Sequence, residues 1–376
     1  MNESPGPLMQ SPPGPSAVID GRRYLYFVGT GYLGLQGRAE VILAACEAAR
    51  QFGVGSATTR AGYGNSQPTL DVERLAAELL DAEAAFYLPT GYAAASVLAG
   101  TLADRIDAVF LDELSHYSLV EAAASLRKPV SRFRHADAND LREKIARHLP
   151  PGHRPLVLSD GVFAARGRIA PVADYLDVFR SYPGAALLID DAHGLGVLGQ
   201  SGRGTFEHAG LHEEINTDGG SKFLCGTLSK AIGGYGGIIA GPRAMIDRAK
   251  AASHWYDGVS PMPAPVAAAT ARGLELVLAE PGLRTALREN VRSLRDGLRQ
   301  LGIQVEDTPV PIVCLVLGGA ERMKRIQGEL RERGILIAYM AAYSGLGPEG
   351  ALRLAVFANH RSEMIEELLD ALRQVV

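Results

Sequence analysis

The chain has 376 residues, of which 47% are hydrophobic and 21% charged, and its formal net charge at pH 7 is -4. This length is enough for one large packed domain with a smaller one attached, and the weakly acidic balance argues against nucleic acid or an anionic membrane surface as a partner. Glycine, proline or charge interrupts every apolar run before it reaches the length of a membrane span.

The N-terminus and the cysteines indicate the compartment. Residues 1–18, rich in proline, serine and glycine, lack the basic and apolar regions of a signal peptide, and they predict a flexible extension with ordered structure from about Ile19. The three cysteines, Cys46, Cys225 and Cys314, lie far apart among apolar neighbours, which is typical of free thiols in a reducing compartment. We therefore expect a cytoplasmic protein.

From about residue 75, short apolar strands alternate with helical stretches. The expected strands are residues 84–89, 107–112, 155–160, 185–191, 223–229 and 236–241, and the helices between them are residues 91–103, 118–126 and 171–179. Strands that alternate with helices at this spacing predict a mainly parallel sheet covered by helices on both faces.

The pattern changes after Pro263. Residues 263–280 and 283–301 have the apolar spacing of long helices, and they are followed by strands at 311–318, 335–341 and 352–358, with helices at 321–333 and 362–376. We expect a flexible extension (1–18), an N-terminal arm (19–50), a large domain (51–283) and a smaller α+β domain (284–376).

Chemically useful side chains follow the ends of several expected strands, where open α/β sheets bind ligands. Asp190 ends the strand in "LLIDDAHG", with His193 just beyond it, and His116 lies at a strand-to-helix turn in "LDELSHYSLVEAA". Lys230 lies between an apolar run and five glycines in "CGTLSKAIGGYGGIIAG". A buried carboxylate needs a cationic partner, and a lysine amine becomes reactive when it is partly desolvated.

An anion site is expected beside these groups. Thr90, Gly91 and Tyr92 open a helix, where free backbone N–H groups favour a phosphate, and Thr227 precedes the lysine. An amine, a strand-end carboxylate, an imidazole and an anion cradle are together the set that pyridoxal phosphate requires. The sequence therefore predicts pyridoxal phosphate as the cofactor, with Lys230 as its Schiff-base lysine.

The motifs "DDAHGLGVLGQSGRG" and "GTLSKAIGGYGG", in this order, resemble those of the α-oxoamine synthases, a family of fold-type-I pyridoxal-phosphate enzymes. The likeness runs from "YLYFVGTGYLGLQ" to "RLAVFANHRSEMIEEL". It implies the pyridoxal-phosphate-dependent transferase fold of type I, with residues 51–283 as the cofactor-binding domain. It also implies a homodimer, because the family builds its sites at a two-fold interface.

The resemblance assigns roles at the cofactor. Asp190 pairs with the pyridinium nitrogen, His193 contacts the phenolic oxygen, and His116 stacks on the ring. Asp160, in "SDGVF", matches an acidic position close to the cofactor. The positions expected around the phosphate are Thr90, Gly91, Tyr92, Thr227 and Ser260, of which Ser260 replaces a Ser-Thr pair that reaches the neighbouring subunit.

The resemblance also assigns the substrate positions and the reaction. Arg353 matches the residue that binds the amino-acid carboxylate, and Ser344 lies where the family often has threonine. The implied substrates are an amino acid and an acyl-CoA: Lys230, displaced by the amino acid, removes its Cα proton as general base, the carbanion attacks the thioester, and CoA leaves. Decarboxylation usually follows.

Several substrate-facing positions differ from the family pattern. Thr30 replaces an asparagine that reaches the substrate, Thr69 a histidine, and Ala95 a further asparagine. In "GVFAARG", Ala164 replaces a serine and Arg166 an acidic residue. The cofactor anchors are kept while these positions have changed, so the pattern predicts the cofactor and leaves the amino acid and the acyl donor open.

Other functions remain to be weighed. The same scaffold supports aminotransfer and aldol cleavage, and a catalytically silent partner subunit is the alternative of another class, although such a subunit has no need of Lys230. Residues 194–199 match G-x-G-x-x-G, but no helix follows them to receive a pyrophosphate. His208 and His212 are four residues apart without a further ligand cluster, so we expect no metal site.

Overall fold

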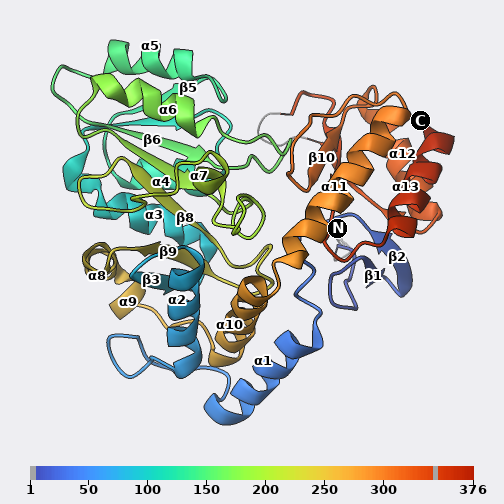
Figure 1. Ribbon diagram of the computed structural model, residues 1–376, viewed down its shortest axis with the longest axis horizontal. Coiled ribbons are helices and arrows are strands. Elements are labelled where there is room, and N and C mark those ends of the chain that lie inside the picture. Colours follow the sequence, from blue (N-terminus) through green and yellow to red (C-terminus); the bar gives the residue numbers. More distant parts are fainter. Residues whose placement is uncertain (1–5, 342–345) are drawn as a thin grey trace, which may run out of the picture. The chain divides into compact units, whose positions relative to one another are not determined.

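The computed structural model describes residues 6–341 and 346–376 (Figure 1). These residues form two compact units. The first unit comprises Met1–Ala39, Ala164–Arg168 and Pro281–Val376, and the second comprises Glu40–Phe163 and Ile169–Glu280. Two stretches distant in the sequence thus join the C-terminal part of the chain in the first unit, a grouping that the order of the sequence does not indicate.

A seven-stranded sheet forms the centre of the second unit. Its order is β3 (Ala84–Leu88), β9 (Gly237–Gly241), β8 (Lys222–Thr227), β7 (Ala186–Asp190), β6 (Pro155–Asp160), β4 (Ala108–Asp112) and β5 (Val130–Phe133). Strand β9 is antiparallel to both of its neighbours, and all other pairs are parallel. The expected mainly parallel sheet is therefore confirmed.

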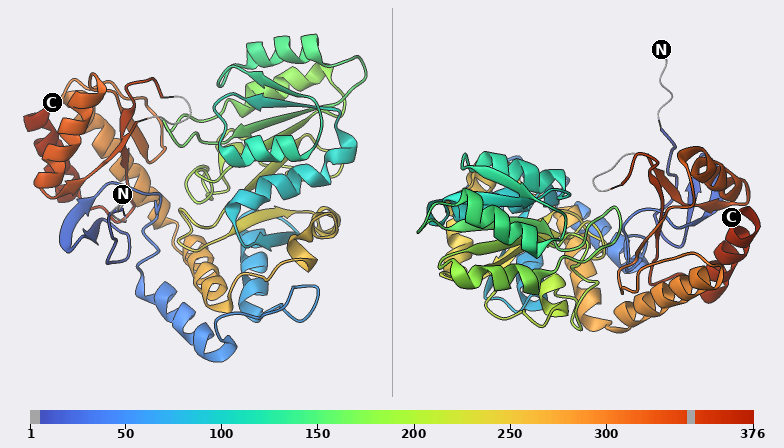
Figure 2. Two further views of the ribbon diagram at one scale, coloured as in Figure 1. Left: turned by 180° about the vertical axis from the view of Figure 1, so that it is seen from behind. Right: turned by 90° about the horizontal axis from the view of Figure 1, so that it is seen from above.

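Helices cover both faces of this sheet (Figure 2). The helices from Ala39 to Glu280 are α1 (Ala39–Phe52), which starts at the last residue of the first unit, α2 (Gln67–Leu79), α3 (Gly91–Thr101), α4 (Tyr117–Ser125), α5 (Ala138–His148), α6 (Val172–Val178), α7 (Thr205–His208), α8 (Arg243–Ala251), α9 (His254–Asp257) and α10 (Ala264–Ala279), with short 3₁₀ turns at Ala103–Arg105 and Phe179–Ser181. Strands β4, β6 and β7 are buried at every position, as expected for a sheet with two covered faces. The core joins strand residues such as Leu158 and Phe223 to Leu98 of α3 and Leu119 of α4.

The first unit contains two three-stranded sheets. One has the order β1 (Ser16–Ile19), β2 (Arg22–Tyr26), β11 (Ile335–Leu336), and the other β10 (Ile312–Leu315), β13 (Ala351–Ala355), β12 (Ala338–Met340). The helices are α11 (Gly282–Gln300), α12 (Ala320–Glu332) and α13 (Ser362–Val375). The expectation of one strand at 335–341 was wrong: β11 pairs with β2 and β12 pairs with β13, so the segment passes from one sheet to the other at Ile337.

Part of the segment expected to be flexible is hydrogen-bonded. Strand β1 begins at Ser16, and the Gln10 amide donates to the Val18 carbonyl at 2.8 Å. The Asp20 amide donates to the Leu8 carbonyl at 3.0 Å. The backbone groups from Leu8 onward thus have partners in the first sheet, which the proline-rich composition did not indicate.

His360 is a buried, neutral residue of the first unit. Its Nδ1 accepts a hydrogen bond from the Phe357 amide at 3.0 Å, and its Nε2 lies 3.2 Å from the Tyr26 carbonyl, which fixes the Nε2–H tautomer. The imidazole also stacks on Phe27, with centroids 4.3 Å apart. Burial lowers the pKa of His360 to about 4, although the bond to Tyr26 opposes this shift.

The low pKa of His360 predicts acid sensitivity. Between the unfolded pKa of about 6.5 and the folded pKa of about 4, the unfolded chain binds more protons, so acidification favours unfolding and lowers the free energy of unfolding by up to about 3 kcal/mol. Urea unfolding at pH values from 7 to 4 measures this loss. In His360→Gln, whose amide has the same donor and acceptor but no charge, we expect a shallower pH dependence. Equal pH dependence in both proteins would contradict the assignment.

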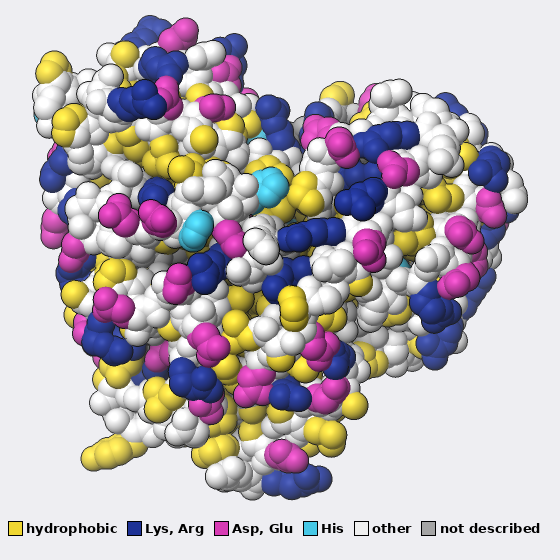
Figure 3. Space-filling model, in the orientation of Figure 1, with side chains coloured by type: hydrophobic (Ala, Val, Ile, Leu, Met, Phe, Trp, Pro, Cys, Tyr) yellow, Lys and Arg dark blue, Asp and Glu magenta, His cyan; other side chains and the backbone are white. Residues whose placement is uncertain are grey.

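No described helix combines the length and the apolarity that crossing a membrane requires. On the face drawn in Figure 3, basic and acidic side chains are interspersed. This mixture agrees with the nearly balanced count of 38 Lys and Arg against 42 Asp and Glu.

Candidate active site

Polar residues end four neighbouring strands of the seven-stranded sheet. Strands β4, β6, β7 and β8 end at Asp112, Asp160, Asp190 and Thr227. Because these strands are parallel, their C-terminal ends meet at one edge of the sheet. Asp160 and Asp190 are partners in the register of β6 and β7. Burial, together with the charge of Asp190, raises the pKa of Asp160 well above its usual value.

Lys230 and His193 meet at this edge. The Nζ atom of Lys230, in the loop between β8 and β9, lies 2.9 Å from Nε2 of His193. The loop that carries His193 is closed by the buried Asp191, which accepts hydrogen bonds from the Thr205 amide at 2.5 Å and the Thr205 hydroxyl at 2.7 Å. Burial raises the pKa of Asp191 to about 6. The structure thus brings together the predicted amine and an imidazole.

Asp190 is a buried carboxylate with few polar partners. Its Oδ2 accepts a hydrogen bond from the Ser118 hydroxyl at 3.2 Å, and its Oδ1 accepts one from the Ala192 amide at 3.2 Å. Burial raises the pKa of Asp190, while the charges of Lys230 and His116 lower it. A cation placed beside this carboxylate would stabilise its charged form further.

His116 caps helix α4 and is held by its neighbours. Its amide donates to Oδ2 of Asp160 at 2.8 Å, and its Nδ1 accepts from the Ser118 amide at 3.2 Å. The rings of Tyr92 and Tyr117 approach it edge-on, with centroids 6.0 and 6.1 Å away. Burial lowers the pKa of His116; the positive charge of Lys230 acts in the same direction, and Asp190 opposes both. These shifts favour the neutral ring.

The N-terminus of helix α3 lies beside the end of β8. Thr90 caps this helix and accepts a hydrogen bond from the Tyr92 amide at 3.2 Å. A Cβ atom added to Gly91 would lie 2.6 Å from Oγ1 of Thr227, so only glycine permits this approach. The Thr227 hydroxyl donates to the Gly236 carbonyl at 2.8 Å. Ser260 is exposed, between α9 and α10.

The predicted substrate residues belong to the first unit. Arg353, on β13, is 7% exposed; its Nε donates to the Ala164 carbonyl at 3.0 Å and its Nη1 to the Gly29 carbonyl at 3.3 Å. Burial raises the pKa of Tyr32 to about 12, and Arg353, which bonds to its hydroxyl, opposes this. Thr30 is half-buried beside Gly29. Ser344 lies outside the described residues.

The positions that depart from the family pattern are spread over both units. Thr69 is buried in α2, where its hydroxyl lies 3.0 Å from that of Ser66, and Ala95 is buried in α3. Arg166 is exposed.

Two contacts of the site were not predicted from the sequence: the hydrogen bond from Ser118 to Asp190, and the closure of the His193 loop by Asp191. Ser118 follows His116 by two residues, a common spacing for a helix cap, and this was the available signal. Its contact with Asp190 spans 72 residues and left no trace in the local pattern.

Comparisons with known proteins cover nearly the whole chain. The family model for aminotransferase class I and II matches residues 30–372. The 8-amino-7-oxononanoate synthase of Cellvibrio japonicus is 35% identical over 98% of this chain and 91% of its own length, and that of Thioalkalivibrio sulfidiphilus is 36% identical over 95% and 90%. Two solved serine palmitoyltransferases superpose with a TM-score of 0.90, each covering 98% of this chain and 92% of its own. The S. paucimobilis enzyme, solved with pyridoxal phosphate and myriocin bound, is 26% identical, and the Sphingomonas wittichii enzyme 28%.

Proposed function

This chain belongs to the α-oxoamine synthase family of pyridoxal-phosphate-dependent acyltransferases, and we propose that it condenses an amino acid with an acyl-CoA thioester, as its 8-amino-7-oxononanoate synthase relatives suggest. The observation that carries this proposal is the meeting of Lys230, His193, Asp190 and His116 at one edge of the seven-stranded sheet. The second unit is then the cofactor-binding domain, expected at residues 51–283, and the first unit contains the expected small domain.

The residues of the second unit fit pyridoxal phosphate. The buried Asp190 carboxylate accepts two hydrogen bonds, each at 3.2 Å. A protonated ring nitrogen would supply it with a further donor. Gly91 keeps the N-terminus of the 11-residue helix α3 against Thr227, where an anion is favoured. The residues that would hold the cofactor are Lys230, Asp190, His193, His116, Asp160, Thr90, Gly91, Tyr92, Thr227 and, from the partner subunit of a dimer, Ser260.

Each side chain then has a separate task. When bound, pyridoxal phosphate supplies an electron sink for negative charge at the α-carbon of an amino acid. Asp190 would keep a proton on the ring nitrogen of the bound cofactor, and His116, whose pKa is lowered by burial, would lie against the ring without adding a charge. Lys230 anchors the cofactor through Nζ and, when free, takes up the α-proton there as general base. His193, 2.9 Å from that amine, orients it.

Arg353 is proposed to bind the carboxylate of the amino acid. Two backbone carbonyls fix its guanidinium, and its remaining N–H groups have the fork geometry that suits a carboxylate. Thr30 and Ser344 are proposed to line the same site. The carbonyl of Ala164 accepts from Arg353, so the departures from the family pattern at Thr30 and Ala164 lie next to the residue that selects the substrate.

A thiol-release assay tests the reaction. The purified enzyme with pyridoxal phosphate is incubated with a panel of amino acids and acyl-CoA thioesters, and separately with amino acids and a 2-oxo acid. The proposal predicts free CoA thiol only in the first mixture, and only with both substrates present. Exchange of the amino group with the 2-oxo acid, without thiol release, would assign aminotransfer instead.

The phosphate site predicts a strong effect of Gly91→Ala. The added methyl group would lie 2.6 Å from the Thr227 hydroxyl and would force the start of α3 away from β8, so we expect about tenfold weaker binding of pyridoxal phosphate or more. Absorbance titration of the apoenzyme measures the dissociation constant. Gly100→Ala is the matched control, because that glycine lies in the same helix with nothing within 4 Å. Unchanged affinity in Gly91→Ala would contradict the assigned cradle.

A cytoplasmic homodimer is proposed as the working form. Large apolar side chains are exposed on α1 and the segment after it, including Leu43 at 58%, Val54 at 85% and Tyr63 at 97%. The segment from Val54 to Tyr63 is anchored by the buried Arg60. The Arg60 guanidinium forms two hydrogen bonds with the Glu73 carboxylate, at 2.6 and 3.0 Å. Large apolar side chains that are this exposed suit contact with a second copy of the chain. Sedimentation equilibrium is expected to give twice the mass of 39.9 kDa.

A further inference from the structure

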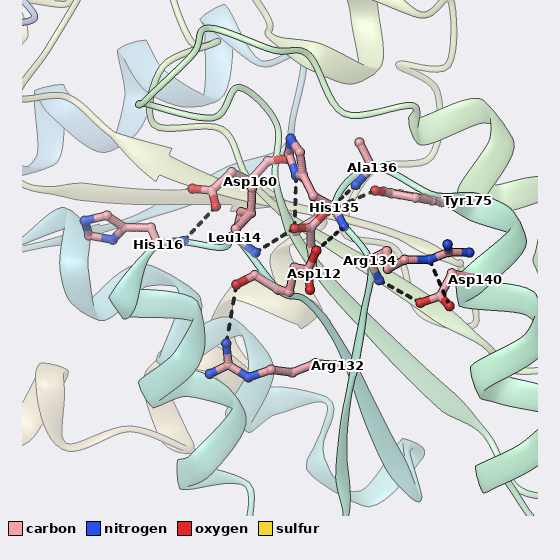
Figure 4. A network of polar contacts seen from close by, with 12 residues as sticks. Asp112, Leu114, His116, Arg132, Arg134, His135, Ala136, Asp140, Asp160 and Tyr175 are labelled. Carbon is pink, nitrogen blue, oxygen red and sulfur yellow. Dashed lines mark hydrogen bonds and ion pairs between the residues drawn. The ribbon is translucent and has the colours of Figure 1, made fainter. Parts of the chain in front are cut away.

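A buried carboxylate outside the proposed cofactor contacts organises the loop that carries His116. Asp112 ends strand β4 and is fully buried. Its Oδ1 accepts from the Leu114 amide at 2.9 Å and lies 3.2 Å from Nδ1 of His135, and its Oδ2 accepts from the Ala136 amide at 2.8 Å (Figure 4). The Tyr175 hydroxyl completes the set at 3.4 Å. Each of the two carboxylate oxygens therefore has two partners within the chain.

The backbone and imidazole donors come from the loops that follow the two neighbouring strands β4 and β5. Leu114 belongs to the loop between β4 and α4, whereas His135 and Ala136 belong to the loop between β5 and α5. Asp112 thus ties these two loops together. Glu113 adds to the tie, since its amide donates to the Phe133 carbonyl at 3.0 Å and its Oε1 accepts from the His135 amide at 3.1 Å.

The tied loop ends at His116. From Asp112 it continues through the Ser115 amide, which donates to the Asp112 carbonyl at 3.1 Å, to the His116 amide, which donates to Asp160 at 2.8 Å. The loop is therefore fixed at its beginning by Asp112 and at its end by Asp160 (Figure 4). Between these points, the backbone of His116 has little freedom to shift along the edge of the sheet.

We propose that Asp112 is a positioning residue for the acyl transfer: through the loop that it shares with His135, it holds His116 at the edge of the sheet where the cofactor binds. This inference rests on the proposed function, in which His116 lies at the cofactor. Asp112 itself is not a catalytic residue, because its oxygens are occupied by donors of the chain. Asparagine at position 112 would have nearly the same volume as aspartate. Its NH₂ group would face backbone or side-chain donors that now bind a carboxylate oxygen, and the loss of those hydrogen bonds would loosen the loop.

Asp112→Asn and Asp140→Asn form a matched pair. Asp140 is also a buried carboxylate that binds a backbone amide beside β5, that of Arg134 at 2.7 Å, but the partners of its carboxylate lie in the Arg134 segment and not in residues 113–118. Hydrogen exchange of the peptide covering residues 113–118 is expected to be about tenfold faster in Asp112→Asn and unchanged in Asp140→Asn. Only Asp112→Asn should weaken the visible circular dichroism of added pyridoxal phosphate and lower kcat by about tenfold at little changed KM.

The outcomes separate the two hypotheses. Unchanged exchange at residues 113–118 in Asp112→Asn, or equal loss of the circular dichroism in both variants, overturns the positioning role. If the wild-type protein binds no cofactor, the proposed function fails while the exchange experiment still decides whether Asp112 holds the loop. Should Asp112→Asn not fold, His135→Leu removes one donor and is expected to change exchange in the same direction, by about threefold; no change there would contradict the proposal.

Discussion

Replacing Lys230 by alanine is expected to lower kcat/KM for acyl transfer by about 10³-fold or more and to remove the visible absorption of the bound cofactor. The amine lies 2.9 Å from His193, at the edge where Asp190 and His116 also lie. Loss of the side chain removes both the anchor of the cofactor and the group that takes up the α-proton. Steady-state thiol release and an absorption spectrum measure the two effects.

Lys222→Ala is the control for this experiment. Lys222 begins the same strand whose end precedes Lys230, and its Nζ donates to the Leu211 carbonyl at 3.2 Å, at the opposite end of the strand. We expect activity within about twofold of wild type and an unchanged spectrum. If Lys222→Ala lost the spectrum while Lys230→Ala kept it, the assignment of the amine would be wrong.

Asp190→Asn is expected to lower kcat/KM by about 100-fold or more, because a neutral amide cannot stabilise a protonated ring nitrogen. The substitution keeps the size of the side chain and an oxygen for the Ala192 amide. Stopped-flow measurement of α-proton removal, with a deuterated amino acid for comparison, is expected to show that this step has become slower.

A second variant weakens the environment of Asp190 without removing its charge. Ser118→Ala removes one hydrogen bond to the carboxylate and leaves its charge, so the loss should be smaller than in Asp190→Asn. A thermal unfolding curve for each variant controls for misfolding. If Asp190→Asn retained wild-type rates, Asp190 would be a structural carboxylate and the electronic role would belong to another group.

The site could be predicted from the sequence because its reactive side chains lie at or just after the ends of predicted strands. Asp190, His193 and Lys230 each follow a buried run, and a parallel sheet brings such strand ends to one edge whatever their separation in the chain. That geometric rule is why Asp190, His193, His116 and Lys230, which come from three separate motifs, could be grouped from the sequence alone.

Contacts that depend on tertiary packing were not predictable in this way. Asp112 ends a strand as Asp190 does, but its partners His135 and Ala136 come from the loop after an edge strand that the apolar pattern did not reveal, since Val130 and Arg132 in β5 are exposed. The division of residues 335–341 between two sheets depends on β2, more than 300 residues earlier in the chain. Local periodicity contains no information on such partners.

The central claim is that the amine of Lys230 holds pyridoxal phosphate. The most direct measurement is reduction of the purified, cofactor-loaded protein with borohydride, followed by proteolysis and mass spectrometry of the peptides. We predict a pyridoxyl group on one lysine, in the peptide that contains Lys230. A pyridoxyl group on a different lysine, or none on a protein that has bound the cofactor, would contradict the account.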